Sequence, residues 1–429
     1  MNEMTLSPID HAIAMELTVP GDKSISHRAV IFSSLAKGTS HVSNFLAGED
    51  CMRTIQVFRE LGVKIEQSDT DLVITSEGIA SLKEAERPVY FGNSGTTARL
   101  VTGVLAALPL FTTCHGDASL SKRPMDRVIL PLHQMGAKID GRSEGSYLPL
   151  AIHGTSLRGI TYEMPVKSAQ VKSAILLAGM LSSGETTIIE QVKTRDHTEQ
   201  MLPQFGVDLT IEGKKVIIHG GQEPVPADLT VPGDISSAAF FLAAAAIVPG
   251  SHIIVRDVGL NPTRIGLIEA LEMMGADILV KETRRIGGEP VGNVEIKYKV
   301  LSGAHIEGEL IPSLIDELPI LALIATQARG KTIIGDAGEL RVKETDRIAA
   351  VAQVLTSFGA EVEEKEDGLI IHGKTSLKGT VADSYMDHRI GMMISIASLV
   401  AEGETVLTNG QCIDISYPGF FDHLESLKK

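Results

Sequence analysis

The segment PGDKSISHR near the amino terminus combines cations and hydroxyl groups where a helix is predicted to begin. Lys23 and Ser24 lie at the expected helix start, and Arg28 follows Ser24 by four residues on the same face. Because the amides of a helix start attract negative charge, these three side chains can bind one anion. A second copy of the segment, PGDISSAAF, has Ile235 and Phe240 at the positions of Lys23 and Arg28. The scaffold therefore folds without the charges, which favours anion binding over a capped helix with solvated cations.

Two further segments of the first half are ambiguous by themselves. GNSGTTARL is a small-residue turn that opens a predicted apolar helix, with Arg99 in its first turns. Alone it indicates no more than a turn and a helix cap. LSKRPMDR places Lys122, Arg123 and Arg127 beside a proline. This arrangement fits an anion site and a solvated basic turn equally well.

The second half contributes carboxylates. Asp316 and Glu317 interrupt the apolar run SLIDELPILALIA. Desolvation raises the pKa of a carboxyl group toward the range useful for a general base; the alternative is that Asp316 caps a helix. In LRVKETDR, Lys343 and Arg347 are spaced to share a helix face, with Glu344 beside them. They could hold a phosphate while offering a proton, or form an exposed ladder of ion pairs.

The segment MDHRIGMM adds Asp387, His388 and Arg389 before another apolar helix, where His388 could be either structural or functional. Each of these segments has a plain structural explanation. Together, however, basic groups recur near helix starts in both halves of an acidic chain. This recurrence predicts a cationic cleft for a polyanionic ligand.

An internal repeat predicts the elements that position these residues. LTVPGD occurs at residues 17–22 and again at 229–234, so the chain consists of two related halves. Within each half, segments such as ELGVKI and QMGAKI place a glycine after a helical pattern, and strands of the type DLVITSEG recur. Six α/β units fit the length, and the sixth is incomplete at the carboxyl end. We therefore expect the amino-terminal stretch, residues 1–19, to supply the missing strands and to pack with the carboxyl-terminal half.

The domains follow from this pattern. We predict one lobe at residues 22–231 and a discontinuous lobe of residues 1–21 and 232–429, with a small-molecule cleft between them.

Composition excludes several classes of protein. The 429 residues carry a formal net charge of −15, which disfavours a nucleic-acid binder. The longest apolar run, residues 238–248, is shorter than the roughly 20 residues of a membrane helix, and the start has no leader-like pattern, so we expect a cytoplasmic protein. Three scattered cysteines predict reduced thiols.

GLIIHGKT matches a P-loop expression, but its middle residues are typical of a strand, so Lys374 is not predicted to bind ATP.

In this order along nearly the full chain, PGDKSISHR, GNSGTTARL, KRPMDR, SAQVKSA, VKETDR and DHR closely resemble the 5-enolpyruvylshikimate-3-phosphate (EPSP) synthase family. The resemblance implies a two-domain inside-out α/β barrel of six βαβαββ units. It implies transfer of the enolpyruvyl group of phosphoenolpyruvate to the 5-hydroxyl of shikimate 3-phosphate, with release of phosphate, in aromatic amino-acid and chorismate biosynthesis. No metal or organic cofactor, nucleic acid or membrane is implied, and we expect a monomer.

The resemblance also implies roles for individual residues. Asp316 is the base and Glu344 the acid, Lys23 stabilises developing charge, and His388 has a supporting role. Phosphoenolpyruvate is bound by Lys23, Asn93, Gly95, Arg123, Gln170, Arg347 and Arg389. Shikimate 3-phosphate is bound by Ser24, Arg28, Ser168, Ala169, Gln170, Thr194, Arg195, Asp316 and Lys343.

Two positions depart from other members of this family. Ile415 stands where some members have a lysine that contacts phosphoenolpyruvate, so another group or a bound monovalent cation would have to compensate. Leu100 follows Arg99 where another branch has proline, which resembles the branch less sensitive to the herbicide glyphosate. Gly95 nevertheless leaves room for that inhibitor.

Two alternatives compete with this function. The sister enolpyruvyl transferase that acts on UDP-N-acetylglucosamine carries a cysteine where this chain has Ala118, and Cys114 lies too far upstream. A repeat scaffold that encircles DNA would need positive charge in every repeat, whereas here the cations are missing from the second copy.

Overall fold

The structure is a computed structural model that describes residues 3–429, and it contains two compact units. The 21–231 unit comprises Gly21–Val231 and the short segment Ile286–Glu289. The 232–429 unit comprises the chain up to Pro20 together with Pro232–Arg285 and Pro290–Lys429. The predicted division into a lobe of residues 22–231 and a discontinuous lobe of residues 1–21 and 232–429 stays a prediction.

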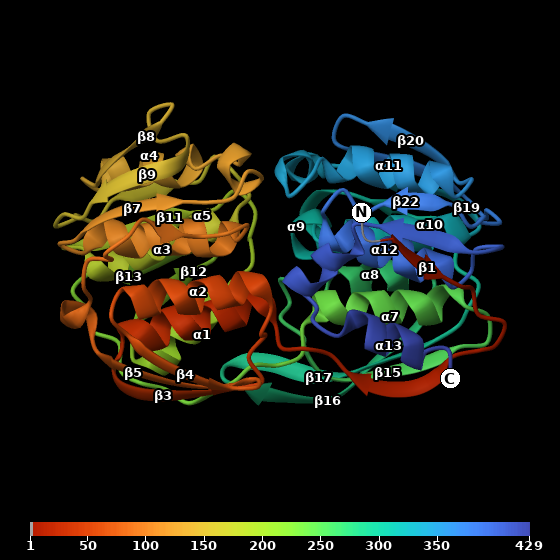
Figure 1. The fold of residues 1–429 in the computed structure, drawn as a ribbon, viewed down its shortest axis with the longest axis horizontal. Coiled ribbons are helices and arrows are strands. Elements are labelled where there is room, and N and C mark those ends of the chain that lie inside the picture. Colours follow the sequence, from red (N-terminus) through yellow and green to blue (C-terminus); the bar gives the residue numbers. More distant parts are fainter. Residues whose placement is uncertain (1–2) are drawn as a thin grey trace. The chain divides into compact units, whose positions relative to one another are not determined.

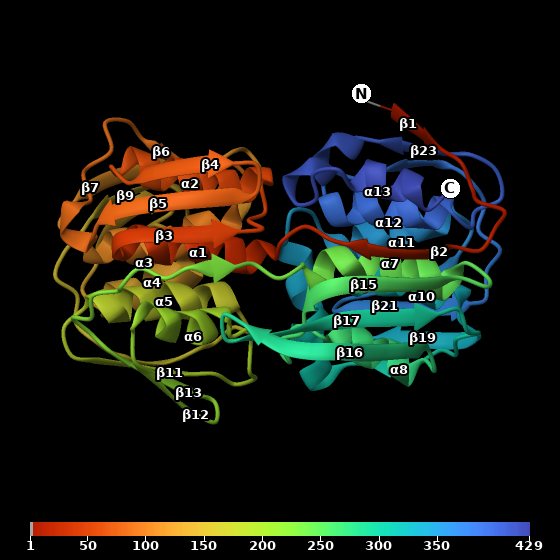
Figure 2. The same cartoon turned by 90° about the horizontal axis from the view of Figure 1, so that it is seen from below.

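The 21–231 unit has three four-stranded sheets on its outside (Figures 1 and 2). In each sheet a parallel edge pair is followed by two antiparallel pairings. In spatial order the strands are β14 Leu229–Thr230, β3 Lys37–Ser43, β5 Asp71–Glu77 and β4 Lys64–Ser68; β6 Val89–Tyr90, β7 Phe111–His115, β9 Tyr147–His153 and β8 Lys138–Arg142; and β10 Thr161–Glu163, β11 Glu185–Ile189, β13 Lys215–His219 and β12 Leu209–Glu212.

Helices fill the inside of this unit (Figure 1). Three of them are buried along most of their length, with mostly apolar or small residues and a few buried polar side chains. These core helices are α1 Lys23–Leu35, α3 Gly95–Ala107 and α5 Ala169–Leu181. The others are α2 Glu49–Glu60, α4 Asp126–Gln134 and α6 His197–Met201.

The 232–429 unit repeats this plan with two four-stranded sheets and one three-stranded sheet. In spatial order the strands are β16 Asp277–Ile286, β17 Glu289–Lys297, β15 His252–Gly259 and β2 Ala14–Thr18; β18 His305–Ile306, β19 Gly330–Ile334, β21 Gly368–Gly373 and β20 Glu361–Lys365; and β1 Glu3–Leu6, β23 Thr405–Thr408 and β22 Val381–Asp383. Its core helices are α7 Ile235–Ile247, α10 Leu318–Gln327 and α12 His388–Ser398, and the others are α8 Gly266–Met273, α9 Ile311–Leu314, α11 Arg347–Ser357 and α13 Phe420–Ser426.

The amino-terminal strands belong to sheets of the 232–429 unit. β1 pairs antiparallel with β23, and β2 pairs parallel with β15 (Figure 2). The expectation that this stretch supplies strands to the carboxyl-terminal half is therefore confirmed. The predicted α/β class with helices inside and sheets outside is also confirmed. Among the described residues, no helix is long and apolar enough to span a membrane.

The glycine of each internal period ends a helix as predicted. Gly62, Gly136, Gly206, Gly275 and Gly359 all have a positive φ, the left-handed conformation that glycine adopts without strain. The strand segments of the repeat form β5, β9, β13 and β21. The periodic pattern therefore identified both the helix ends and the strands.

Gly103 permits close packing of α3 against α5. A Cβ atom at this position would lie 2.3 Å from the carbonyl oxygen of Ala174. We expect Gly103→Ala to lower the free energy of unfolding by about 1–3 kcal/mol, because the two helix backbones must separate. Urea titration measures this. Gly338→Ala, whose Cβ would meet nothing closer than 3.8 Å, is the control. Equal stabilities of the two variants would contradict the packing constraint.

Candidate active site

Several predicted site residues of the 21–231 unit lie at the starts of its core helices. Asp22 caps α1 and accepts a hydrogen bond from the amide of Ile25, so Lys23 and Ser24 form its first turn. Lys23 pairs with Asp50, at the start of α2. These cations are therefore not simply solvated, which disfavours the alternative of a capped helix with free charges.

Arg28 is buried and held from three sides. Its Nε donates to Thr198 Oγ1 at 2.7 Å, Nη1 to the carbonyl of Ser24 at 2.9 Å and Nη2 to Ser173 Oγ at 2.6 Å. Burial lowers the pKa of Arg28 to about 10, and the positive charge of Arg195 acts in the same direction. The charge of Arg195 therefore acts on Arg28, which the resemblance assigns to the same substrate.

The start of α3 and the buried Arg123 form one cluster. Ser94 caps the helix, accepting from the amide of Thr97. Arg123 donates to Asn93 Oδ1, to the Asn93 carbonyl at 3.3 Å and to Ser119 Oγ at 3.2 Å. A Cβ atom at Gly95 would lie 3.4 Å from Arg123 Nη1 and 2.9 Å from Arg99 Nη1. A side chain at this position would crowd the guanidinium of Arg99, whereas its distance to Arg123 would be an ordinary van der Waals contact.

The start of α5 joins this cluster through Gln170. Ser168 caps the helix, and Ala169 is its first residue. Gln170 donates to Thr96 Oγ1 at 2.9 Å and accepts from Arg99 Nη1 at 2.6 Å. The structure thus brings the starts of α3 and α5 together.

A buried ion cluster shapes the loop that carries Thr194. Lys172 Nζ lies 3.0 Å from Glu190, 2.7 Å from Glu199 and 3.3 Å from the Thr194 carbonyl. Glu190 also accepts from the amide and hydroxyl of Thr194. Burial raises the pKa of Glu199, and the charge of Lys172 opposes this shift. The loop is therefore tied to α5 by charge as well as by hydrogen bonds.

In the 232–429 unit, Arg347 connects three carboxylates. Its guanidinium lies 2.8 Å from Asp387, 2.7 Å from Glu344 and 3.1 Å from Asp316, and its side chain is 1% exposed. Burial by itself lowers the pKa of Arg347, but the three carboxylates raise it above its ordinary value. The predicted base and the predicted acid therefore bind the same cation.

Lys343 and Arg389 also face Asp316. Lys343 Nζ lies 3.5 Å from Asp316 Oδ1, and Arg389 Nη1 donates to the Asp316 carbonyl at 2.9 Å. The prediction that Lys343 and Arg347 share a helix face is wrong. Asp346 caps α11 by accepting from the amide of Ala349, so the helix begins at Arg347 and Lys343 lies in the preceding turn. Folding of this turn, and not helical spacing, brings the two cations to Asp316.

The sequence predicted that an apolar helix follows the DHR segment. In the structure the segment itself forms the start of α12. Asp387 is the cap, accepting from the amide of Arg389, and His388 is buried in the first turn. Asp316 caps no helix, because Glu317 holds the cap position of α10 without a side-chain cap bond. The ion pairs with Lys343 and Arg347 explain the placement of Asp316.

Sequence reasoning did not select several residues that hold the site. Asp50, Ser173 and Thr198 contact Lys23 or Arg28, and Glu317 contacts Arg389. Glu317 gave a signal as a carboxylate inside an apolar run. Ser173 lies in the quoted SAQVKSA segment but was assigned no role. Asp50 and Thr198 had no signal, because they are ordinary helix residues that only the fold brings close.

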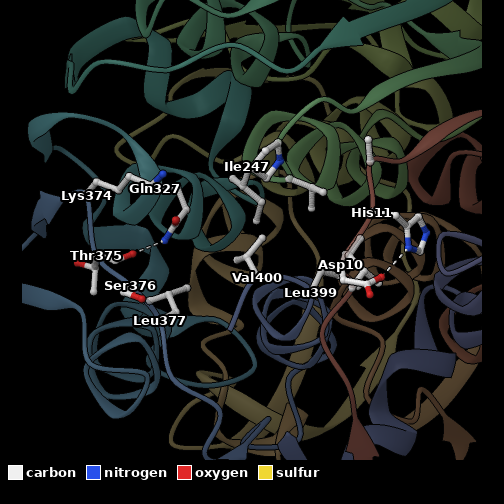
Figure 3. A pocket seen from close by; sticks show the side chains of 14 residues that line it. Asp10, His11, Ile247, Gln327, Lys374, Thr375, Ser376, Leu377, Leu399 and Val400 are labelled. Carbon is white, nitrogen blue, oxygen red and sulfur yellow. Dashed lines mark hydrogen bonds and ion pairs between the residues drawn. The ribbon is translucent and has the colours of Figure 1, made fainter. Parts of the chain in front are cut away.

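A cavity of about 680 Å³ lies elsewhere in the 232–429 unit, where α7, α10 and α12 end (Figure 3). Its wall includes Lys374 and Thr375 of the P-loop-like segment. Residues Gly368–Gly373 of that segment form β21, and Thr375 donates its amide to the Thr326 carbonyl. The segment is therefore a strand and turn, as the sequence predicted.

A family model described as EPSP synthase (3-phosphoshikimate 1-carboxyvinyltransferase) matches residues 9–424. Curated relatives named 3-phosphoshikimate 1-carboxyvinyltransferase are 54% identical in Oceanobacillus iheyensis and 50% identical in Bacillus thuringiensis subsp. konkukian, each over the full length of both chains.

Solved structures agree with these relatives. An EPSP synthase from Acinetobacter baumannii superposes with a TM-score of 0.89 at 43% identity, covering 99% of this chain and 98% of that one. The enolpyruvyl transferase NikO from Streptomyces tendae, at 17% identity and a TM-score of 0.78, covers 99% of this chain and 96% of its own and shares the fold.

The buried His27 of α1 predicts a pH dependence of stability. It is fully buried, and its Nδ1 lies 2.6 Å from Thr54 Oγ1 in a hydroxyl chain that continues to Thr97 and Ser94. Burial, reinforced by the charges of Lys23 and Arg28, lowers the pKa of His27 well below 6.5.

Above pH 6.5, His27 is neutral in both the folded and the unfolded chain. Below it, only the unfolded chain takes up the proton, so stability falls as pH decreases from 6.5 toward the lowered pKa, by up to about 1.4 kcal/mol per pH unit. We expect His27→Gln to remove this slope in urea titrations between about pH 7.5 and about pH 5.5. His11→Gln is the exposed control, and an unchanged slope in His27→Gln would refute the assignment.

Proposed function

Because this chain belongs to the EPSP synthase (3-phosphoshikimate 1-carboxyvinyltransferase) family, we propose that its helix-start cations bind two anionic substrates while Asp316 and Glu344 move protons. The enzyme transfers the enolpyruvyl group of phosphoenolpyruvate to the 5-hydroxyl of shikimate 3-phosphate and releases phosphate, in the shikimate pathway. The sister activity toward UDP-N-acetylglucosamine has less support, since the full-length relatives are named for the shikimate substrate.

Both substrates carry a phosphate and a carboxylate, so the site must compensate roughly five to six negative charges. Lys23, Asn93, Gly95, Arg123 and Gln170 of the 21–231 unit, with Arg347 and Arg389 of the 232–429 unit, bind phosphoenolpyruvate in this proposal. The contacts of Arg123 with Asn93 support it, because they hold a buried guanidinium beside the start of α3, where the helix dipole also favours an anion.

Shikimate 3-phosphate is assigned to Ser24, Arg28, Ser168, Ala169, Gln170, Thr194 and Arg195, with Asp316 and Lys343 from the other unit. The support is their convergence within the 21–231 unit. Arg28 is held by α5 and α6, and the ion cluster of Lys172 ties the Thr194 loop to α5. A phosphate bound there would meet preorganised donors.

The reaction needs a base and an acid that exchange roles. In the addition step the 5-hydroxyl oxygen bonds to the central carbon of phosphoenolpyruvate, Asp316 takes the hydroxyl proton, and Glu344 protonates the methylene carbon. In the elimination step the new methyl group returns its proton to Glu344, the carbon–carbon double bond re-forms, and the bond to the phosphate oxygen breaks as Asp316 gives its proton to the leaving phosphate. Lys23 stabilises the charge that develops. His388, which is buried in the first turn of α12, has a supporting role.

One observation carries this proposal. The guanidinium of Arg347 binds Asp316 and Glu344 at the same time, and Lys343 lies against Asp316. Two carboxylates on one buried cation keep a fixed separation, which suits groups that must act on neighbouring atoms of one intermediate.

We further propose that the enzyme acts on small molecules alone, as a cytoplasmic monomer. The net charge of −15 supports the absence of a nucleic-acid partner, because phosphates would be repelled outside the cationic site. Light scattering of the purified chain tests the monomer, and a dimer mass would contradict it.

Phosphate release from phosphoenolpyruvate plus shikimate 3-phosphate by the purified chain tests the function. We expect Asp316→Asn and Glu344→Gln each to lower kcat by about 10²–10⁴-fold, because each removes a proton carrier. Glu361→Gln, on the exposed strand β20, is the matched control and should retain the wild-type rate. Shikimate 3-phosphate should raise the melting temperature of all variants, and UDP-N-acetylglucosamine should not. Turnover within threefold of wild type in either site variant would exclude that residue as a proton carrier.

A further inference from the structure

We propose that Glu317 is a positioning residue that fixes the guanidinium of Arg389. The carboxylate of Glu317 is itself held in an anion site at the start of α7. The proposal rests on the proposed role of Arg389 in binding phosphoenolpyruvate.

Glu317 is buried among charged and polar partners. Its side chain is 0% exposed. Its Oε1 accepts a hydrogen bond from Ser236 Oγ and lies 3.3 Å from Arg389 Nη1. Its Oε2 is buried with no hydrogen-bond partner among the described residues. A carboxylate in such a place is costly unless it is paired, so its contact with Arg389 must contribute to holding both groups.

The network continues behind Ser236. Arg264 Nη2 donates to Ser236 Oγ at 2.7 Å and to Asp234 Oδ1 at 3.2 Å. Asp234 caps α7 by accepting from the amide of Ser236 at 2.8 Å. Two arginines and two carboxylates thus alternate along one buried chain, whose charges cancel. Movement of Glu317 is therefore restricted by the helix cap as well as by Arg389.

The internal repeat explains why the site exists. Ser236 is the counterpart of Ser24 in the second PGD segment, two residues after the capping aspartate. In the first copy, the helix start offers Lys23 and Ser24, which we assign to substrate. In the second copy, Ile235 replaces the lysine, and the serine hydroxyl donates to Glu317. The start of α7 has no lysine at this position, but its Ser236 hydroxyl still binds an anion, which here is the Glu317 carboxylate of the same chain.

Arg389 also contacts Asp316, the proposed base. Arg389 Nη1 donates to the backbone carbonyl of Asp316, and its Nη2 lies 3.9 Å from Asp316 Oδ2. Glu317 follows Asp316 directly, and its anchored side chain holds Arg389 against the Asp316 carbonyl. Glu317 itself is fully buried and acts only through these neighbours.

Steady-state kinetics of purified variants tests the proposal. Glu317→Gln keeps the shape but removes the charge that orients Arg389, and we expect the KM for phosphoenolpyruvate to rise about tenfold. The KM for shikimate 3-phosphate should stay within about twofold.

Ser236→Ala leaves the carboxylate but removes its anchor, and should raise the KM for phosphoenolpyruvate about threefold. Glu317→Asp should restore part of the loss. Glu295→Gln is the control for removal of a charge. Glu295 lies on β17 and forms ion pairs with two lysines, and its substitution should change neither KM.

Arg389→Lys, alone and combined with Glu317→Gln, separates the two claims. If Glu317 acts through Arg389, the double variant should have the same KM for phosphoenolpyruvate as Arg389→Lys alone. A KM for phosphoenolpyruvate unchanged by Arg389→Lys would refute the role of Arg389 and this inference with it. A large effect of Arg389→Lys with none from a folded Glu317→Gln would refute this inference alone. If Glu317→Gln does not fold, Ser236→Ala decides, and an unchanged KM there overturns the proposal. Equal rises in both KM values would indicate general disruption and would also overturn it.

Discussion

The buried guanidinium of Arg347 is the interaction on which the site of the 232–429 unit depends. It binds carboxylates from three separate segments, at Asp316, Glu344 and Asp387. A buried charge of either sign is stable only with partners, and removing one partner of such a pair costs about 3–5 kcal/mol. Each of the three segments is therefore held where the cation requires it. The same pairing places the two carboxylates assigned to proton transfer on one rigid group.

Capped helix starts provide the second constraint, and both units use it. Asp22, Ser94 and Ser168 cap the three core helices of the 21–231 unit, and Asp234 and Asp387 cap two of those in the 232–429 unit. A capping side chain satisfies amides that would otherwise lack partners, and it determines where the first turn begins. Lys23, Gln170 and Arg389 lie in such first turns, so their positions follow from backbone hydrogen bonding.

Duplication allowed one scaffold to serve two purposes. The start of α1 contains Lys23 and Ser24, whereas the equivalent start of α7 contains Ile235 and a serine bound to Glu317. An aspartate caps the helix in both copies: Asp22 accepts from the amide of Ile25, and Asp234 accepts from the amide of Ser236. What differs is the origin of the anion: substrate in the proposal for α1, and the chain itself at α7.

Much was determined by sequence alone: the six α/β units, the helix-ending glycines, the strands of the repeat and the start of α1 at Lys23. These are local features, set by hydrophobic periodicity and by the few residues that adopt a left-handed turn. Only the tertiary structure decided that Lys23 pairs with Asp50 and that Arg28 donates a hydrogen bond to Thr198. It also decided that the helix after Lys343 begins at Arg347. Partners far apart in the chain leave no spacing signal, because packing of separate elements, and not the order of residues, brings buried opposite charges together.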